Sequence, residues 1–162
     1  MSFPAQRELC SRAAISLIAE TVASADIVSM KRGRILVADD NAVIHAVVKD
    51  AAEARGYQVI SVTTGVGAIV TAITARPDLI VLDIQFPDAD GRDVLARLKA
   101  DPRTAHIPVV VWSGRQGHDS DRRISLELGA EDYVEKSEAE LLVRKIERVL
   151  LRLKESEPKR SA

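Results

Sequence analysis

The chain has 162 residues, of which 46% are hydrophobic and 29% are charged, values typical of a soluble domain with its own core. Lysine and arginine number 23 and aspartate and glutamate 24, a balance that gives no electrostatic basis for binding nucleic acid or an anionic membrane. The one cysteine, Cys10, excludes an intramolecular disulfide and a cysteine-rich zinc site.

Residues 1–33 are expected to form an N-terminal helical extension, with a helix from about residue 5 to 27. Apolar residues recur there at helical spacing, at Leu9, Ala13, Leu17, Ile18 and Val22. The segment loosely resembles a signal peptide, but Glu20 interrupts its apolar stretch, and no apolar run approaches the ~20 residues of a membrane helix. We therefore expect a cytoplasmic protein. The helix could pack on its own domain, contact another protein or a second copy of the chain, or precede a natural start at Met30.

Three short apolar runs rich in β-branched residues predict strands that are buried on both faces of a parallel sheet, over 35–38, 79–82 and 109–112. Weaker runs at 59–62 and 133–134 predict edge strands. Helical patterns fill the intervals, over 41–55, 66–75, 92–100, 119–128 and about 138–153. Residues 154–162 are polar and are expected to be a disordered tail.

This alternation predicts five βα units over residues 34–153 and an α/β fold. Parallel strands joined by helices require right-handed crossovers, and five of them suit a doubly wound sheet of order 2-1-3-4-5. Ligands of such sheets bind beyond the carboxyl ends of the strands, where the strand order reverses.

Five polar residues follow the predicted strands at that edge. Asp39 and Asp40 come after the first strand, Asp83 after the third, Ser113 after the fourth and Lys136 after the fifth. A single aspartate in such a place more commonly caps a helix or a turn. The combination, however, gathers three carboxylates, a hydroxyl and an ammonium in one cleft.

This set of side chains points to phosphoryl chemistry. Three carboxylates repel one another unless a cation lies among them, and Mg²⁺ with oxygen ligands is the common choice beside phosphate. One carboxylate could then attack phosphorus as a nucleophile. Lys136 and the metal would neutralise the phosphoryl oxygens.

Two other phosphate chemistries fit less well. His45 could be taken for a phosphohistidine, but phosphotransfer domains are helical bundles, so we interpret it as an ordinary helix residue. A phosphatase that uses an aspartate nucleophile needs a second aspartate two residues later, and that position is Gln85.

Residues 34–153 resemble the receiver domain of bacterial two-component response regulators, which has a CheY-like, flavodoxin-like fold. The resemblance is carried by an ordered set of motifs: residues 35–41, which include Asp39-Asp40-Asn41; residues 82–87 with Asp83, followed by Gly91; Val111-Trp112-Ser113-Gly114; and residues 129–136, which end in Lys136.

The resemblance implies a role for each of these positions. Asp83 would be the phosphoacceptor, Ser113 and Lys136 would contact phosphoryl oxygens, and Tyr133 would be the switch aromatic. Mg²⁺ would be held by Asp40 directly, by Asp39 through water, by Asp83 and by the backbone carbonyl of Gln85.

Two residues depart from the family pattern. Ser137 stands where the family usually has proline in a cis peptide, so the Lys136–Ser137 bond is expected to be either trans with a shifted loop or a strained cis bond. Gly114 stands where alanine is more usual. Gln85 and Arg115 occupy positions that tune the lifetime of the phosphoryl group.

The resemblance also implies partners. A sensor histidine kinase or a phosphotransfer protein would supply the phosphoryl group, and the surface of the fourth helix, fifth strand and fifth helix would then bind a downstream protein. We expect a stand-alone receiver that is not an enzyme and does not bind DNA. A scaffold that binds its partners regardless of phosphate, and an intermediate of a phosphorelay, are the alternatives.

Overall fold

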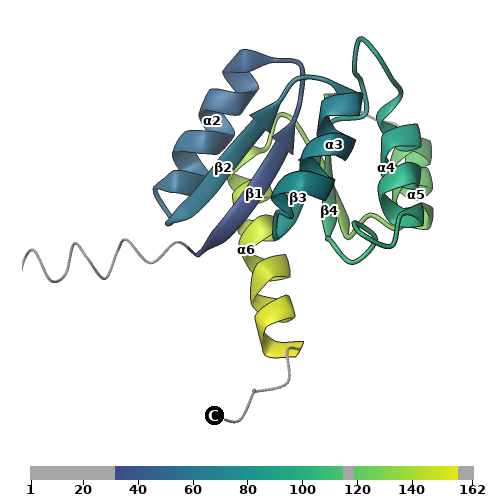
Figure 1. Ribbon diagram of the computed structural model, residues 1–162. Helices are drawn as coiled ribbons and strands as arrows, with labels where there is room; N and C mark the ends of the chain where they lie inside the picture. Colours follow the sequence, from purple (N-terminus) through teal and green to yellow (C-terminus); the bar gives the residue numbers. More distant parts are fainter. Residues whose placement is uncertain (1–31, 115–118, 157–162) are drawn as a thin grey trace, which may run out of the picture. The chain divides into compact units, whose positions relative to one another are not determined.

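The computed structural model describes residues 32–114 and 119–156, so the predicted N-terminal helix and residues 157–162 lie outside the described part. Strands and helices alternate along the chain (Figure 1). In order they are β1 (Gly33–Ala38), α2 (Ala42–Glu53), β2 (Tyr57–Val62), α3 (Gly65–Ala75), β3 (Leu79–Leu82), α4 (Gly91–Ala100), β4 (Val109–Ser113), α5 (Asp119–Glu127), β5 (Asp132–Glu135) and α6 (Ala139–Ser156).

The five strands form one parallel sheet of order β2-β1-β3-β4-β5. This confirms the predicted doubly wound topology, with β2 and β5 at the edges. The register pairs Ala38 with Leu82 across β1 and β3, and Leu82 with Val111 across β3 and β4. Because Ala38 and Leu82 are the last residues of their strands, the register places Asp39 and Asp83 beside one another.

Helices cover both faces of the sheet (Figure 1). One core joins the strands to α3 and α4 and includes Leu36, Ile80 and Val111. The other joins them to α2 and α6 and includes Ile35, Val81, Val110 and Trp112. Successive strand residues point to opposite faces, so a strand with apolar cover on both sides must be apolar throughout. The uninterrupted apolar runs of the sequence have this cause.

Short polar side chains after the strands cap the helices that follow them. The side chain of Asn41 accepts a hydrogen bond from the backbone N–H of Val43, and that of Thr64 accepts one from Gly67. Asp90 accepts one from Arg92 at the start of α4. Such caps satisfy backbone donors that have no partner inside the helix. They fix where each helix begins.

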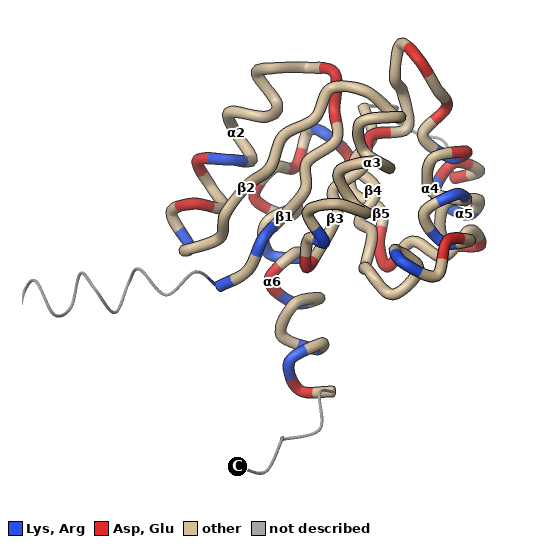
Figure 2. The backbone as a smooth tube through the Cα atoms, in the orientation of Figure 1, with Lys and Arg blue, Asp and Glu red and all other residues tan. Residues whose placement is uncertain are grey.

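The last helix extends further than the sequence indicates. We expected it to end near residue 153, but α6 continues to Ser156, so residues 154–156 of the expected tail are helical. The Lys154 ammonium donates a hydrogen bond to the Arg32 carbonyl at 3.4 Å, and lysine and glutamate are good helix formers. Basic and acidic residues both occur along α2, α5 and α6 (Figure 2). Within the described ranges, no helix has the length and apolar character needed to cross a bilayer.

Gly91 brings the start of α4 against the loop that follows β3. Its N–H donates to the Ile84 carbonyl at 2.6 Å. A Cβ at this position would overlap the Asp83 carbonyl oxygen and the Ile84 Cα, which are backbone atoms with little room to move. The close approach therefore requires glycine.

We predict that Gly91→Ala lowers the free energy of unfolding by about 1–3 kcal/mol, as for other overpacked sites. Gly114→Ala is the matched control, because its Cβ would meet the Lys136 Cδ at an ordinary contact distance of 3.5 Å. Urea denaturation of the two variants measures both effects. A Gly91→Ala protein as stable as Gly114→Ala would contradict the close packing.

Candidate functional site

Three carboxylates meet at the carboxyl ends of β1 and β3, as the topology predicts. Asp39, Asp40 and Asp83 each offer an oxygen, and these oxygens lie within 4.8 Å of one another. Asp39 and Asp83 are 2% and 3% exposed, whereas Asp40 is exposed to solvent. The cluster therefore has a buried pair of carboxylates and a third that opens to water.

The ammonium of Lys136 lies between the two buried carboxylates. Its Nζ is 2.6 Å from Asp39 Oδ2 and 2.8 Å from Asp83 Oδ2. Lys136 follows β5, which is separated from β3 by β4, so its long side chain reaches across a strand. The sequence pattern predicts that this lysine pairs with a phosphoryl group. The structure gives it two carboxylate partners.

Each buried carboxylate is held in the same way. One oxygen accepts a hydrogen bond from a backbone N–H two residues later: Asn41 donates to Asp39 Oδ1 at 2.8 Å, and Gln85 donates to Asp83 Oδ1 at 3.2 Å. The second oxygen of each faces Lys136. The carboxylate orientations are therefore set by the turns that follow β1 and β3.

Burial dominates the electrostatics of Asp83. Its removal from water raises the pKa of the Asp83 carboxyl above the usual range, against the opposing effect of Lys136. Burial alone would lower the pKa of Lys136, but its ion pairs with Asp39 and Asp83 outweigh this and raise the pKa. Lys136 is therefore held as a cation, whereas burial disfavours the ionised form of Asp83 relative to its protonated form.

His45 has a contact that the sequence analysis did not foresee. This α2 residue is 8% exposed, and its Nε2 lies 2.5 Å from the Asp39 carbonyl oxygen. Since a carbonyl only accepts, Nε2 donates this hydrogen bond, and Nδ1 is buried without a partner among the described residues. His45 thus fixes the backbone of a buried site residue. His45 lies one turn into the helix that follows Asp39-Asp40. This position is the sequence feature from which the contact could have been predicted.

The remaining expected site residues lie at the same edge of the sheet or just below it. Ser113 ends β4, is fully buried, and accepts the Lys136 N–H on its carbonyl at 2.9 Å. Tyr133 is 5% exposed, and its hydroxyl is buried with no hydrogen-bond partner in the described part of the chain.

The described chain contains no cis peptide bond, so the Lys136–Ser137 bond is trans. Arg115 lies outside the described residues.

The cluster is chemically suited to a divalent cation. Its donors are carboxylate oxygens, the ligands that Mg²⁺ and Mn²⁺ prefer. Three carboxylates with one ammonium leave two negative charges in excess, which one divalent ion would neutralise. Asp39, Asp40 and Asp83 therefore fit such an ion.

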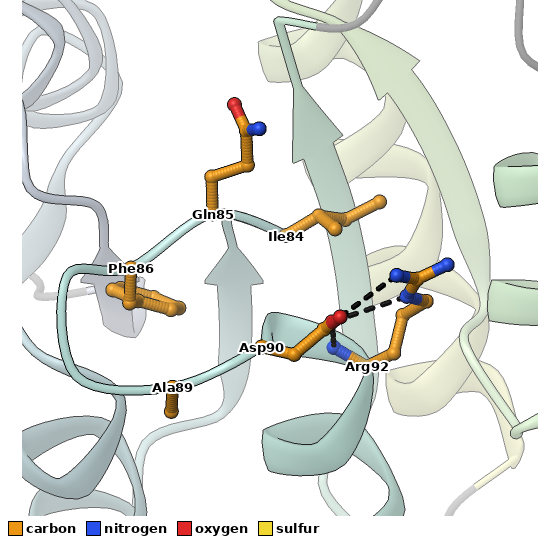
Figure 3. A pocket seen from close by; sticks show the side chains of 6 residues that line it. All are labelled: Ile84, Gln85, Phe86, Ala89, Asp90 and Arg92. Atoms are coloured by element: carbon orange, nitrogen blue, oxygen red, sulfur yellow. Dashed lines mark hydrogen bonds and ion pairs between the residues drawn. The ribbon is translucent and has the colours of Figure 1, made fainter.

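A separate pocket of about 230 Å³ lies on the loop between β3 and α4 (Figure 3). It is lined by Ile84, Gln85, Phe86, Ala89, Asp90 and Arg92. The Arg92 guanidinium is held by Asp90 at 2.7 Å and by Asp121 of α5 at 3.2 Å. None of the three clustered carboxylates lines this pocket, but Gln85, two residues after Asp83, does. The arginine of the pocket ties the start of α4 to α5.

Comparisons with known proteins agree with the observed fold. A family model described as the response regulator receiver domain matches residues 35–147. The transcriptional regulatory protein KdpE of Mycobacterium tuberculosis is 40% identical over 102 residues, which are 63% of this chain and 43% of KdpE. The chain thus spans less than half the length of this curated relative.

Solved structures are similar too. The phosphorylated cyanobacterial phytochrome response regulator RcpA is 31% identical with a TM-score of 0.64, over 74% of this chain and 94% of RcpA. The Mn²⁺-bound form of response regulator Rcp1 is 27% identical with a TM-score of 0.61, over 71% of this chain and 91% of Rcp1.

The raised pKa of Asp83 predicts how stability depends on pH in metal-free buffer. A raised pKa means that folding favours the protonated carboxyl, so stability is lost as pH rises through the folded pKa. Asp83→Asn cannot ionise and should be more stable than the wild type at pH 7, with the difference shrinking below pH 4. Urea unfolding across pH with a chelator present measures this.

Asp101 supplies a control of opposite sign. Arg103 lowers the pKa of Asp101 to about 2, so this carboxylate contributes stability that is lost as pH falls through that value. Asp101→Asn should therefore be less stable than the wild type at pH 7. If Asp83→Asn were also less stable there, the attraction to Lys136 would outweigh the cost of burial.

Proposed function

The chain belongs to the family of response regulator receiver domains, and we propose that Asp83 is its phosphoacceptor. The donor is a phosphohistidine of a sensor histidine kinase or a phosphotransfer protein. An Asp83 carboxylate oxygen supplies the electron pair of the new O–P bond. The P–N bond of the donor breaks, and its electron pair leaves with the imidazole nitrogen. The product is an acyl phosphate on Asp83.

The observation that carries this proposal is the Lys136 ammonium at 2.8 Å from Asp83 Oδ2. A cation fixed beside the nucleophile can pair with the oxygens of an incoming phosphoryl group, where charge develops. Asp83 suits the role of nucleophile better than Asp39. Its backbone hydrogen bond is longer, at 3.2 Å against 2.8 Å, and His45 additionally holds the Asp39 carbonyl.

We propose that the resident metal is Mg²⁺, held by Asp39, Asp40, Asp83 and the backbone carbonyl of Gln85. When bound, the ion neutralises negative charge on the phosphoryl oxygens. The excess negative charge of the cluster supports this assignment. The Mn²⁺-bound form of Rcp1 supports a divalent ion in a related protein.

We further propose that phosphorylation changes the surface formed by α5, β5 and α6. Ser113 hydrogen-bonds a phosphoryl oxygen, and the Tyr133 ring changes position in response. The inner face of α5 supports a shift of this kind, because it buries the polar side chains of Asp121 and Ser125. A helix held by few apolar contacts costs less to move.

This surface would bind a downstream protein partner, with residues 34–153 acting as a stand-alone, cytoplasmic receiver. In this reading the protein is a phosphoacceptor and not an enzyme with a separate substrate, and it makes no direct contact with DNA. A scaffold that ignores phosphate and a phosphorelay intermediate are the competing functions. The relay shares the chemistry at Asp83 and differs only in passing the phosphoryl group on to another histidine.

Intact mass after incubation with acetyl phosphate tests the acceptor. We expect the wild type to gain one phosphoryl group in the presence of Mg²⁺ and none with a chelator, and Asp83→Asn to gain none. Asp88→Asn is the matched control, since Asp88 belongs to the same loop but caps α3 through Gly65 and Val66. It should be labelled like the wild type.

The outcomes separate the candidate functions. Labelling of Asp83→Asn would place the acceptor elsewhere. A folded wild type that gains nothing would favour the scaffold.

The N-terminal extension requires its own test. We propose that residues 1–33 make protein contacts, and a homodimer is the simplest form. Deleting residues 1–29 should then convert a dimer into a monomer, which light scattering after gel filtration measures. An unchanged number of subunits would remove the dimerisation proposal.

A further inference from the structure

The single tryptophan of the chain contacts the peptide group that precedes the site lysine. Trp112 belongs to β4 and is 1% exposed. Its indole Nε1–H donates a hydrogen bond to the Glu135 carbonyl at 3.0 Å. Glu135 is the last residue of β5, and its carbonyl belongs to the peptide group that leads into Lys136.

Both ends of this peptide group are held. Its carbonyl accepts from Trp112 and also from the Glu138 N–H at 3.1 Å, and its N–H, that of Lys136, donates to the Ser113 carbonyl at 2.9 Å. β4 therefore fixes the peptide by two consecutive residues, through the side chain of Trp112 and the backbone of Ser113. With this plane fixed, the N–Cα bond of Lys136 is held in place, which limits the directions in which its side chain can leave the backbone.

We propose that Trp112 is a positioning residue for Lys136, which its indole N–H holds in reach of Asp83. The inference rests on the proposed function, because it assigns Lys136 to the phosphoryl group. A lysine has several rotatable bonds, so fixing its backbone narrows the region that the ammonium explores. Small displacements of a group that stabilises a transition state reduce rates steeply.

A purely structural role is the competing explanation, because Trp112 is also a large member of the core shared with α2 and α6. The two roles differ in which atom matters. Packing depends on the volume of the ring system, whereas positioning depends on the N–H that meets Glu135. They also differ in whether the effect passes through Lys136.

The test compares acetyl phosphate labelling rates of the full chain in Mg²⁺ for four proteins: the wild type, Trp112→Phe, Lys136→Ala and the double variant. We expect Trp112→Phe to lower the maximal rate about tenfold with little change in the KM for acetyl phosphate. In the Lys136→Ala background the same substitution should have no further effect. Equal losses in both backgrounds, or no loss in either, would overturn the proposal.

Val110→Ala is the matched control for lost packing. Val110 lies on the same strand and in the same core but makes no contact with Glu135 through a side-chain donor. It should label at the wild-type rate despite its lower stability. A tenfold loss here too would assign the effect of Trp112→Phe to packing and overturn the proposal.

A second variant covers the case in which Trp112→Phe fails to fold. Because the chain has one tryptophan, expression with benzothienylalanine in place of tryptophan replaces only this indole N–H with sulfur and keeps the ring shape. The labelling rate should again fall about tenfold. A rate equal to that of the wild type would overturn the proposal.

Failure of the proposed function gives a different result. A wild type that is never labelled refutes the phosphoacceptor, and unfolding of the same four proteins by urea then decides the positioning role. Non-additive losses of stability for Trp112→Phe and Lys136→Ala would support it, and additive losses would overturn it.

Discussion

The site depends on one ammonium group placed between two buried carboxylates. Two aspartates this deeply buried cannot stay ionised without a cation, because the interior solvates charge poorly. Asp39 comes from β1, Asp83 from β3 and Lys136 from the loop after β5. The ion cluster therefore forms only when β1 and β3 are neighbours and β5 lies on the far side of β4. The site therefore requires this strand order.

The same cluster is suited to the phosphoryl transfer proposed for Asp83. Burial disfavours the ionised form of Asp83, while Lys136 is divided between two acceptors. A phosphoryl group on Asp83 would bring new oxygens to the same cation, so Lys136 can exchange a carboxylate partner for a phosphoryl partner without losing its pairing. The exchange would change the charge and the geometry at the ends of β3 and β5 together, and each of these strands is followed along the chain by a helix that covers the sheet.

The sheet and the membership of the site could be predicted from sequence because local patterns determine them. Uninterrupted apolar runs require two covered faces, and residues directly after parallel strands must share one edge. Local patterns do not determine which distant groups a side chain contacts. The indole of Trp112 meets a carbonyl 23 residues later, and His45 turns back to Asp39. The sequence therefore predicted neither contact. It also did not predict that Lys136 would pair with Asp39 and Asp83 at once.

The two faces of the sheet differ in a way that bears on signalling. On the α2 and α6 face, His45 and Trp112 bond the backbone on either side of the ion cluster, at Asp39 and Glu135. On the opposite face, Tyr133 buries a hydroxyl that has no partner among the described residues. A buried polar group without a partner favours any rearrangement that satisfies it. The α2 and α6 face thus holds the backbone beside Asp39 and Lys136, although His45 Nδ1 is buried there without a partner among the described residues. On the other face, a movement of the Tyr133 ring would give its buried hydroxyl a partner, in line with the proposed switch.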